Sequence, residues 1–473
     1  MTSTWDELRF YGQLACSLFS PSYDLHKVPG PPGQFGVGHI PKIMRPDYHV
    51  QMLEWADEYG GVYKFSLGCQ WVVVISDPAL ALQVLGRGAN SVPRKCVGYQ
   101  FFDLATNHLG RRSFFTTTDE IHWAAVRKAV SPSFNMANVN GTGGVQAAVL
   151  DLQEHLEHTL LNVFVEALFE VDVNTFPCER LDASHVKAWS HAAWGQGPAF
   201  VLAYNAVAEA QQLLGHVFAQ LADVVVSRRP APPSNLNMWA CLSRLKDPRT
   251  GQLMDRDALV PEIGALMMAG FDTGSHTIAW CLFALATHPE HQAAVRQELV
   301  EAGLLQGDAQ LARPPGFEDL SHLTTLNCVI DETMRMYPVA ATASVREVSQ
   351  ATKVGNWVIP PGVIVWPMLY ALHNSQHNWE APEQFRPSRW LDRHSRSSKA
   401  SSQADLSAAA GSGEVAGAGA AEAGQARAKA FLPFSDGIKS CLGQVGLGRV
   451  CAMQGGMVTL HWLVSGRCME KCA

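Results

Sequence analysis

The sequence has 473 residues, of which 47% are hydrophobic, 17% charged and 9% aromatic, and its formal net charge is −7. This composition is typical of a globular protein with a large buried core, and a pI near 6.2 argues against a general nucleic-acid binder, which is normally basic. The 11 cysteines show no paired framework and follow no secretory signal, so we expect reduced thiols.

The first 27 residues resemble a membrane anchor from which the spanning helix is missing. Residues 10–23 are uncharged but too short and too polar to cross a bilayer, and the charges at Asp6, Glu7 and Arg9 argue against a signal peptide. A stiff Val-Pro-Gly-Pro-Pro-Gly hinge follows. We therefore expect an N-terminal segment at residues 1–27 and a single domain at residues 28–473.

The first half of this domain begins with a small sheet and continues with helices. Residues 61–75 alternate as a β-hairpin with its turn near Gly68, and Asp77-Pro78 opens a helix. Apolar residues at helical spacing then predict a short amphipathic helix at residues 119–130 and a longer one at residues 145–168.

The second half contains the longest helical pattern, at residues 257–287, which would extend about 45 Å at 1.5 Å per residue. It is apolar almost all round, so it should run through the core until His288-Pro289 ends it. Further along, we expect a helix at residues 323–336, a hairpin-like pair at residues 353–366 around Pro360-Pro361-Gly362, and an Ala/Gly/Ser-rich disordered insertion at residues 395–430.

The strongest chemical signal is the loop Phe-Leu-Pro-Phe-Ser-Asp-Gly-Ile-Lys-Ser-Cys-Leu-Gly at residues 431–443. Gly437 and Gly443 supply backbone conformations that other residues resist. Backbone N–H groups and the start of a following helix would stabilise a thiolate at Cys441, and a cysteine thiolate is one of the axial ligands that haem iron accepts. A bare Cys-x-Gly is more often a buried structural cysteine, so this motif needs support from others.

A second motif is Glu332-Thr333-Met334-Arg335 on the strongly apolar helix at residues 323–336. Glu332 and Arg335 are three residues apart on one helix face and can form an ion pair, and Arg389 is a second cation for Glu332 in the downstream Phe-Arg-Pro-Ser-Arg-Trp segment. The common alternative is a solvated surface pair.

The long helix has an unusual centre, Ala-Gly-Phe-Asp-Thr-Gly at residues 269–274. The two glycines and the Asp-Thr pair are poor helix formers, so a local widening or kink is expected, and it would leave a groove beside a ligand. The alternative is a packing notch in which the Thr273 hydroxyl bonds to its own backbone.

A fourth motif, Trp123-Ala-Ala-Val-Arg127, presents an aromatic ring and a cation on one helix face. Arg127 could bind an acidic group, although Trp and Arg are also common together on ordinary amphipathic helices.

These four motifs, in this order, resemble the cytochrome P450 family of haem-thiolate monooxygenases. The resemblance runs from the hinge near Pro29 to about Gly456, and the Phe-x-x-Gly-x-x-x-Cys-x-Gly loop makes the combination specific. It implies a mainly α fold with small β-sheets, in which the haem lies between the long central helix and the cysteine loop.

The resemblance also implies a role for each motif. Cys441 would ligate the iron of haem b, and thiolate donation favours O–O cleavage in this family. Asp272 and Thr273 would deliver protons to the bound dioxygen. Trp123, Arg127 and Arg346 would contact haem propionates. Glu332, Arg335 and Arg389 would lock the scaffold beneath the haem, and the cofactor loop would use Phe434, Gly437, Lys439 and Gly443.

Three features depart from the family pattern. Lys439 stands where Arg or His is usual, which keeps the charge but loses the bidentate fork. The chain ends 32 residues after Cys441, where the family normally continues into a hairpin that lines the substrate pocket. The region at residues 130–257 is also short. We expect a shortened product in which the insertion at residues 395–430 occupies a surface position.

The resemblance implies an oxidoreductase that inserts one atom of O2 into a small apolar organic substrate. No nicotinamide or flavin fingerprint occurs in the sequence, so electrons should come from a redox partner, either an NADPH-dependent reductase or a ferredoxin. Our hypothesis is that an acidic partner binds a basic patch formed by Arg111, Arg112, Arg127, Lys128 and Lys439. A solvated charged surface without a partner is the equally weighted alternative. We further expect a monomer without nucleic-acid contacts that touches a membrane peripherally, at the endoplasmic reticulum; a plastid or soluble location is the alternative.

Three other functions compete with this interpretation. The same fold can rearrange peroxides without O2 or a reductase, as an isomerase or lyase, although Asp272-Thr273 argues against it. The chain could also bind haem without catalysis. A zinc enzyme that uses His373 and His377, or His288 and His291, is a third alternative, but the Glu of the usual zinc helix is missing.

Overall fold

The computed structural model describes residues 23–45, 47–96, 99, 112–134, 218–235, 237–306, 310–313, 319, 322–394 and 429–444. The helix expected at residues 145–168, almost all of the insertion at 395–430, the segment before residue 23 and the chain after residue 444 lie outside these described residues.

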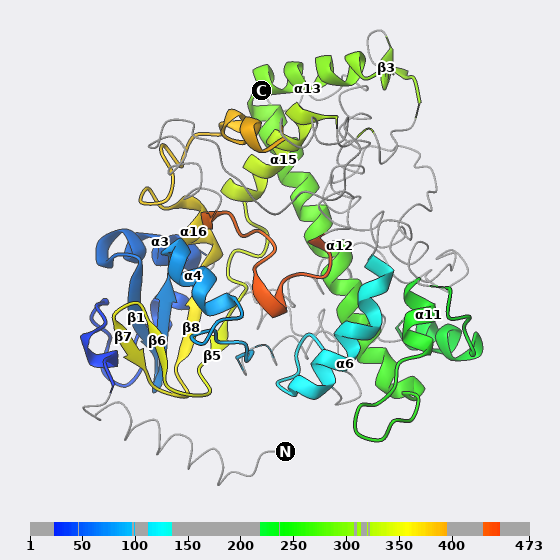
Figure 1. The fold of residues 1–473 in the computed structure, drawn as a ribbon. Helices are drawn as coiled ribbons and strands as arrows, with labels where there is room; N and C mark the ends of the chain where they lie inside the picture. Colours follow the sequence, from blue (N-terminus) through cyan, green and yellow to red (C-terminus); the bar gives the residue numbers. More distant parts are fainter. Residues whose placement is uncertain are drawn as a thin grey trace, which may run out of the picture.

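A four-stranded sheet forms one side of the molecule, with the order β1-β2-β8-β5 (Figure 1). The hairpin expected near Gly68 is confirmed, because β1 (Val62–Leu67) pairs antiparallel with β2 (Gln70–Ile75). The other two strands come from far along the chain: β8 (Ile364–Pro367) pairs parallel with β2, and β5 (Arg346–Glu347) pairs antiparallel with β8. The N-terminal hairpin is therefore completed by a segment almost 300 residues later.

The expected hairpin around Pro360-Pro361-Gly362 is wrong in the position of its turn. The turn lies at Gly355, whose φ is +57°, between β6 (Thr352–Val354) and β7 (Trp357–Ile359). Glycine adopts this left-handed conformation without strain, whereas each proline lacks the N–H that a strand ladder needs. The two prolines instead carry the chain from β7 into β8, which belongs to the larger sheet.

Helices make up most of the remaining described structure, as the sequence predicted. The α-helices are α2 (Ile40–Ile43), α3 (Tyr48–Tyr59), α4 (Pro78–Leu85), α6 (Glu120–Val130), α11 (Met238–Ser243), α12 (Arg256–Thr287), α13 (Pro289–Glu301), α15 (Thr324–Met336) and α16 (Leu369–Asn374). The 3-10 turns are η1 (Leu25–Lys27), η3 (Ser131–Phe134), η6 (Pro387–Trp390) and η7 (Gly437–Lys439), and a short pair joins β3 (Leu305–Gln306) to β4 (Gln310–Leu311).

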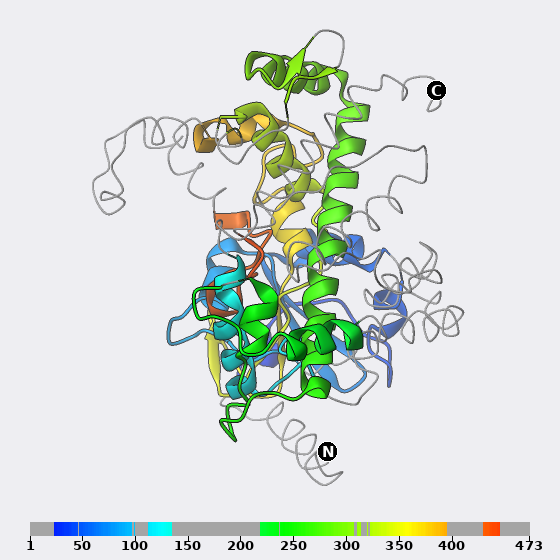
Figure 2. The same ribbon diagram turned by 90° about the vertical axis from the view of Figure 1, so that its right-hand side faces the viewer.

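The central helix α12 crosses the whole molecule (Figures 1 and 2). Its first turn is capped by Asp255, whose side chain accepts a hydrogen bond of 2.7 Å from the Ala258 amide. The helix ends at Thr287, with His288 as its C-cap, because the following residue is Pro289, which starts α13. Apolar side chains of α12 pack with α6 and α11 in one large cluster, so the expectation of a helix through the core is confirmed.

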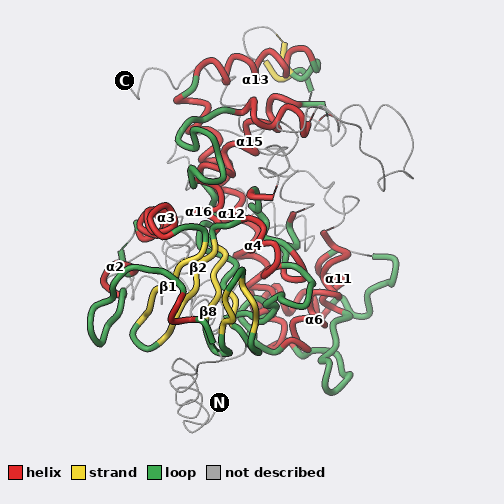
Figure 3. The backbone as a smooth tube through the Cα atoms, turned by 60° about the vertical axis from the view of Figure 1, so that its left-hand side comes forward, coloured by secondary structure: helices red, strands yellow, loops and turns green. Residues whose placement is uncertain are grey.

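The segment at residues 429–444 lies between the sheet side and α12, as the red ribbon in Figure 1 shows. Leu432 packs in the cluster that covers the sheet, whereas Leu442 packs against the helical cluster of α6, α11 and α12. In Figure 3, α3 and α4 lie beside the sheet, and α6 and α11 lie on its right-hand side. The cysteine loop thus joins two cores, and burial at both ends fixes its place.

Candidate functional site

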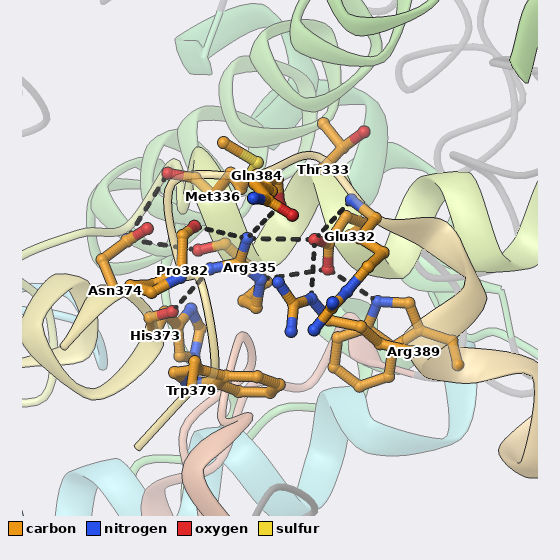
Figure 4. A network of polar contacts seen from close by, with 12 residues as sticks. Glu332, Thr333, Arg335, Met336, His373, Asn374, Trp379, Pro382, Gln384 and Arg389 are labelled. Atoms are coloured by element: carbon orange, nitrogen blue, oxygen red, sulfur yellow. Dashed lines mark hydrogen bonds and ion pairs between the residues drawn. The ribbon is translucent and has the colours of Figure 1, made fainter. Parts of the chain in front are cut away.

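A buried polar network surrounds Glu332 on α15 (Figure 4). The Glu332 side chain has no accessible surface. Arg335, also fully buried, donates two hydrogen bonds of 3.0 Å to the two carboxylate oxygens of Glu332. Arg389 donates from Nε to Glu332 Oε1 at 3.2 Å. Both expected ion pairs therefore form, and burial excludes the alternative of a solvated surface pair.

Neighbouring groups complete this network, which we call the Glu332 hub. The Trp390 indole N–H donates to Glu332 Oε2 at 2.9 Å, and the Arg386 amide donates to Oε1 at the same distance. The remaining guanidinium N–H groups of Arg335 and Arg389 donate to backbone carbonyls, those of His373, Pro382, Gln384, Glu380 and Ala381. Two cations thus share one carboxylate, and carbonyl dipoles solvate the extra charge.

The cysteine loop is held by its own backbone and by α4. The Cys441 amide donates to the Phe434 carbonyl at 2.9 Å, which closes the loop. Gly437 has φ +73°, and a side chain there would collide with the Leu85 carbonyl oxygen at the end of α4. Only glycine fits this position, for both its conformation and its space.

The Cys441 thiol keeps accessible surface, so it is not the buried structural cysteine of the alternative interpretation. Desolvation by the surrounding protein nevertheless raises its pKa. The backbone N–H groups of Gly443 and Gln444 and the charge of Arg127 act in the opposite direction but do not outweigh it. The expected thiolate is thus not the resting state of the free thiol, and coordination of a metal ion would supply the driving force for deprotonation.

Cations gather beside this thiol on α6 and on the loop. The Arg127 guanidinium lies over the Trp123 ring at 5.5 Å and donates to the Ser440 hydroxyl at 3.5 Å. Lys439 Nζ lies 3.2 Å from the Trp123 ring centroid and pairs with Glu120. Because the Lys439 side chain is only 3% exposed, its expected place in a surface basic patch is wrong.

Lys95 joins these cations, although no sequence motif pointed to it. Its backbone pairs in an antiparallel bridge with Arg346 at the edge of the sheet, so two buried cations lie at one place. Lys95 Nζ donates to the carbonyls of Phe114 and Phe115 at 2.9 and 2.6 Å. Burial lowers the pKa of Lys95 to about 7, and the charges of Lys439 and Arg346 add to this effect.

These side chains fit the anionic edge of a haem. Within the described residues, Glu120 is the carboxylate in an ion pair with this group, which contains Lys95, Arg127, Arg346 and Lys439. An excess of buried positive charge is costly unless an anion compensates it. Two propionates would do so, while Cys441 offers the sulfur that an iron ion accepts.

On α12, Asp272 is buried with 1% exposure, and Thr273 is partly exposed. The Thr273 hydroxyl donates to the Ala269 carbonyl at 2.8 Å, as the packing-notch alternative predicted. The helix stays α-helical through this stretch, so the expected widening is not found. The carbonyl of Asp272 is 2.8 Å from both the Ser275 hydroxyl and His276 Nδ1.

Comparison with known proteins decides the family. A sequence model described as Cytochrome P450 matches residues 144–452. The chain belongs to the cytochrome P450 family. The match includes α12, the Glu332 hub and Cys441, whereas Trp123 and Arg127 precede it. This P450 accordingly has the mainly helical fold with small sheets that its motifs implied.

Curated relatives carry the same family name at low identity. The chain is 26% identical to the cytochrome P450 monooxygenase yanC of Aspergillus niger, over 77% of this chain and 72% of the relative. It is 25% identical to the cytochrome P450 monooxygenase macC of Penicillium terrestre, over 78% and 73%. The putative cytochrome P450 CYP13A10 of Caenorhabditis elegans is 24% identical, over 77% and 80%. These relatives support a general P450 monooxygenase role, with its haem, O2, substrate and redox partner.

The zinc alternative finds no support in this P450. Across the described ranges, no three His, Cys, Asp or Glu side chains are grouped so as to hold a metal ion. His373 is fully buried, and its Nε2 already accepts a hydrogen bond from the Leu432 amide at 2.9 Å. The His288 and His291 rings instead contact the Phe385 ring, with centroids 4.8 and 5.7 Å from it, in tilted and edge-on arrangements.

Sequence reasoning missed Lys95 and the structural use of His373. Both act through backbone groups of distant segments, and a local pattern carries no signal for such contacts.

None of the helices in the described ranges combines the length and the apolar character that a membrane-spanning helix needs.

Proposed function

We propose that this P450 inserts one oxygen atom of O2 into a small apolar organic substrate, with two electrons from a reductase partner. The observation that carries the proposal is Cys441, which is exposed in a loop packed between two cores, beside the partly buried Arg127 and the buried side chain of Lys439. Bound there, a thiolate-ligated haem b supplies the activation of O2.

The protein's own residues would hold this cofactor in two ways. Cys441 would provide the iron ligand, and the loop residues Phe434, Gly437 and Gly443 would shape its backbone. The propionates would pair with Lys95, Arg127, Arg346 and Lys439, while the Trp123 ring lies against two of these cations. The Glu332 hub would keep α15, α16 and the segment around Arg389 rigid beneath the cofactor.

The central helix would form the substrate side. Ala269 is exposed and Thr273 partly exposed, one turn apart on a helix that is otherwise mostly buried and apolar at its centre. Thr273 would release the Ala269 carbonyl and turn its hydroxyl into the site, and the Asp272 carboxyl would pass a proton to the Thr273 hydroxyl oxygen. An apolar wall with one hydroxyl suits a lipid-like or terpenoid-like substrate.

The reductase would dock on the exposed cations near α6. Lys128 and Arg112 are exposed, and we retain them in the proposed patch together with Arg127 and without Lys439. Arg111 lies outside the described residues. If this patch guides the partner, the reduction rate falls as ionic strength rises. A rate unchanged by salt would exclude electrostatic guidance.

We further propose one domain from residue 28, a monomeric state and peripheral contact with the endoplasmic reticulum membrane.

The experiment that tests the function is a reduced carbon-monoxide difference spectrum of the purified protein. The wild-type chain should show the band of a thiolate-ligated haem, and Cys441→Ala should lose it. Cys69→Ser is a matched control, because Cys69 is also an exposed free thiol but lies in the β1–β2 turn. A wild-type protein that binds no haem, or binds it through nitrogen, would refute the proposal.

A further inference from the structure

We propose that His373 is a positioning residue that fixes the cysteine loop relative to the Glu332 hub. The inference rests on the proposed function, because the position of Cys441 has a consequence only when its sulfur ligates iron. His373 lies in α16 and has no accessible surface.

Its two polar ends contact the two structures that must be aligned. The backbone carbonyl of His373 accepts a hydrogen bond of 3.0 Å from Arg335 Nη1. Its ring Nε2 accepts one of 2.9 Å from the Leu432 amide. One buried residue thus joins the hub directly to the second residue of the cysteine loop.

From Leu432 the hydrogen bonds continue to the ligand. The Leu432 carbonyl accepts from the Ser435 amide at 3.0 Å, and the Phe434 carbonyl accepts from the Cys441 amide at 2.9 Å. The Ser435 hydroxyl also meets the Ser344 hydroxyl at 2.8 Å. The loop is therefore a short, hydrogen-bonded structure whose start is set by the His373 ring, so a shift of Leu432 moves the whole loop.

The ring can fulfil this role only as a neutral acceptor. Since Nε2 accepts from an amide, the ring proton must lie on Nδ1. Burial lowers the pKa of His373 to about 3, and the charge of Arg335 acts in the same direction. The ring also packs on Phe431, with centroids 5.5 Å apart. It stays neutral over the physiological range, unlike an ordinary surface histidine.

A merely space-filling role is the competing explanation, and two substitutions separate them. His373→Leu keeps the apolar volume but removes the acceptor, whereas His373→Gln keeps an acceptor oxygen near the Nε2 position. Asn378→Ala is the matched control. Its amide bonds the Ser76 and Leu372 carbonyls beside α16, and no bond from it reaches the described part of the loop.

The first readout needs no haem: hydrogen–deuterium exchange of the Leu432 amide in the apoprotein. A buried amide that loses its acceptor costs about 1–3 kcal/mol, so we expect exchange at least about 5-fold faster in His373→Leu. The second readout is the fraction of the reduced carbon-monoxide complex that keeps the thiolate band. That fraction should fall in His373→Leu, recover in His373→Gln and stay at the wild-type value in Asn378→Ala.

Three outcomes would overturn the inference. One is a His373→Leu protein with wild-type exchange and a wild-type band. Another is a loss of the band in Asn378→Ala as large as in His373→Leu, which would indicate general destabilisation. The third is a His373→Gln protein that folds but lacks the thiolate band. If His373→Leu does not fold, this His373→Gln result alone tests the inference. A wild-type protein without any thiolate band refutes the proposed function instead, while amide exchange still tests His373.

Discussion

Replacement of Glu332 by Gln tests how much the hub stabilises the fold. Gln keeps the size of the side chain and one acceptor oxygen, but it removes the only carboxylate that Arg335 and Arg389 share in ion pairs within the described chain. Both guanidinium groups are almost fully buried, with 0% and 1% exposed side chains. Breaking a buried ion pair by removing one partner costs about 3–5 kcal/mol, because it leaves uncompensated charge.

That loss is large beside the total unfolding free energy of a protein, about 5–15 kcal/mol. Glu332→Gln should therefore unfold at a much lower urea concentration than the wild type, as measured by tryptophan fluorescence and circular dichroism. The carbonyls that also bind Arg335 and Arg389 reduce the loss and place our expectation near the lower end of the range.

Asp223→Asn is the control for this experiment. Asp223 pairs with Arg256, and both side chains are exposed, at 57% and 43%. Such pairs contribute less than about 1 kcal/mol. Equal shifts of the urea midpoint in Glu332→Gln and Asp223→Asn would refute the argument that burial makes the hub important.

Three further predictions concern the site. Thr273→Ala should keep haem but lower the product formed per electron pair; unchanged coupling would contradict the proton-delivery role. Haem affinity of the wild type should decline above pH about 7, where Lys95 loses its proton, and Lys95→Arg should abolish that decline in a haem titration; a decline that persists in Lys95→Arg would exclude Lys95 as its source. The His122 pKa is raised, chiefly by its 2.6 Å hydrogen bond with buried Glu262. The pair therefore stabilises the folded protein fully below the ordinary histidine pKa of about 6.5. This stabilisation is lost as the pH rises through the raised pKa of His122. The melting temperature should therefore fall less between pH 6 and pH 9 in Glu262→Gln than in the wild type, and equal declines would contradict this assignment.

The elements that sequence predicted well are those with strong local signals. The bounds of α12 and α15 differ from the predictions by one residue at most, because Asp255 caps the first helix and prolines follow both of them. The misplaced hairpin had two candidate turns. Pro360-Pro361-Gly362 is the more conspicuous one, but the left-handed turn at Gly355 is compatible with strands on both sides.

Local patterns identified the charged pair of the hub but not its surroundings. Glu332 and Arg335 are one helix turn apart, so their spacing alone predicts contact. The carbonyls that bind Arg335 come from α16 and the segment after it, and no side-chain pattern records a backbone acceptor. Lys95 is missing from the prediction for the same reason, since its partner strand is 251 residues away in the sequence.

The pKa of Cys441 shows why a motif alone does not determine chemistry. The loop supplies the N–H groups that favour a thiolate, as the sequence predicted, yet the burial that fixes the loop has the larger effect. Both follow from the same packing, because a loop held between two cores cannot leave its cysteine fully hydrated.

Cys441 is therefore positioned by tertiary structure as well as by the hydrogen bonds within its own loop. Three separate elements hold the loop: α16 through the His373 ring at Leu432, α4 through the close approach at Gly437, and α6 through Arg127 at Ser440. Each contact is made by residues more than 50 positions away in the sequence. Closing such long loops costs entropy, which is compensated only when the whole domain folds. The site should therefore form cooperatively with the domain. A substitution in any one of the three elements should change the position of Cys441, even though the substituted residue does not contact it.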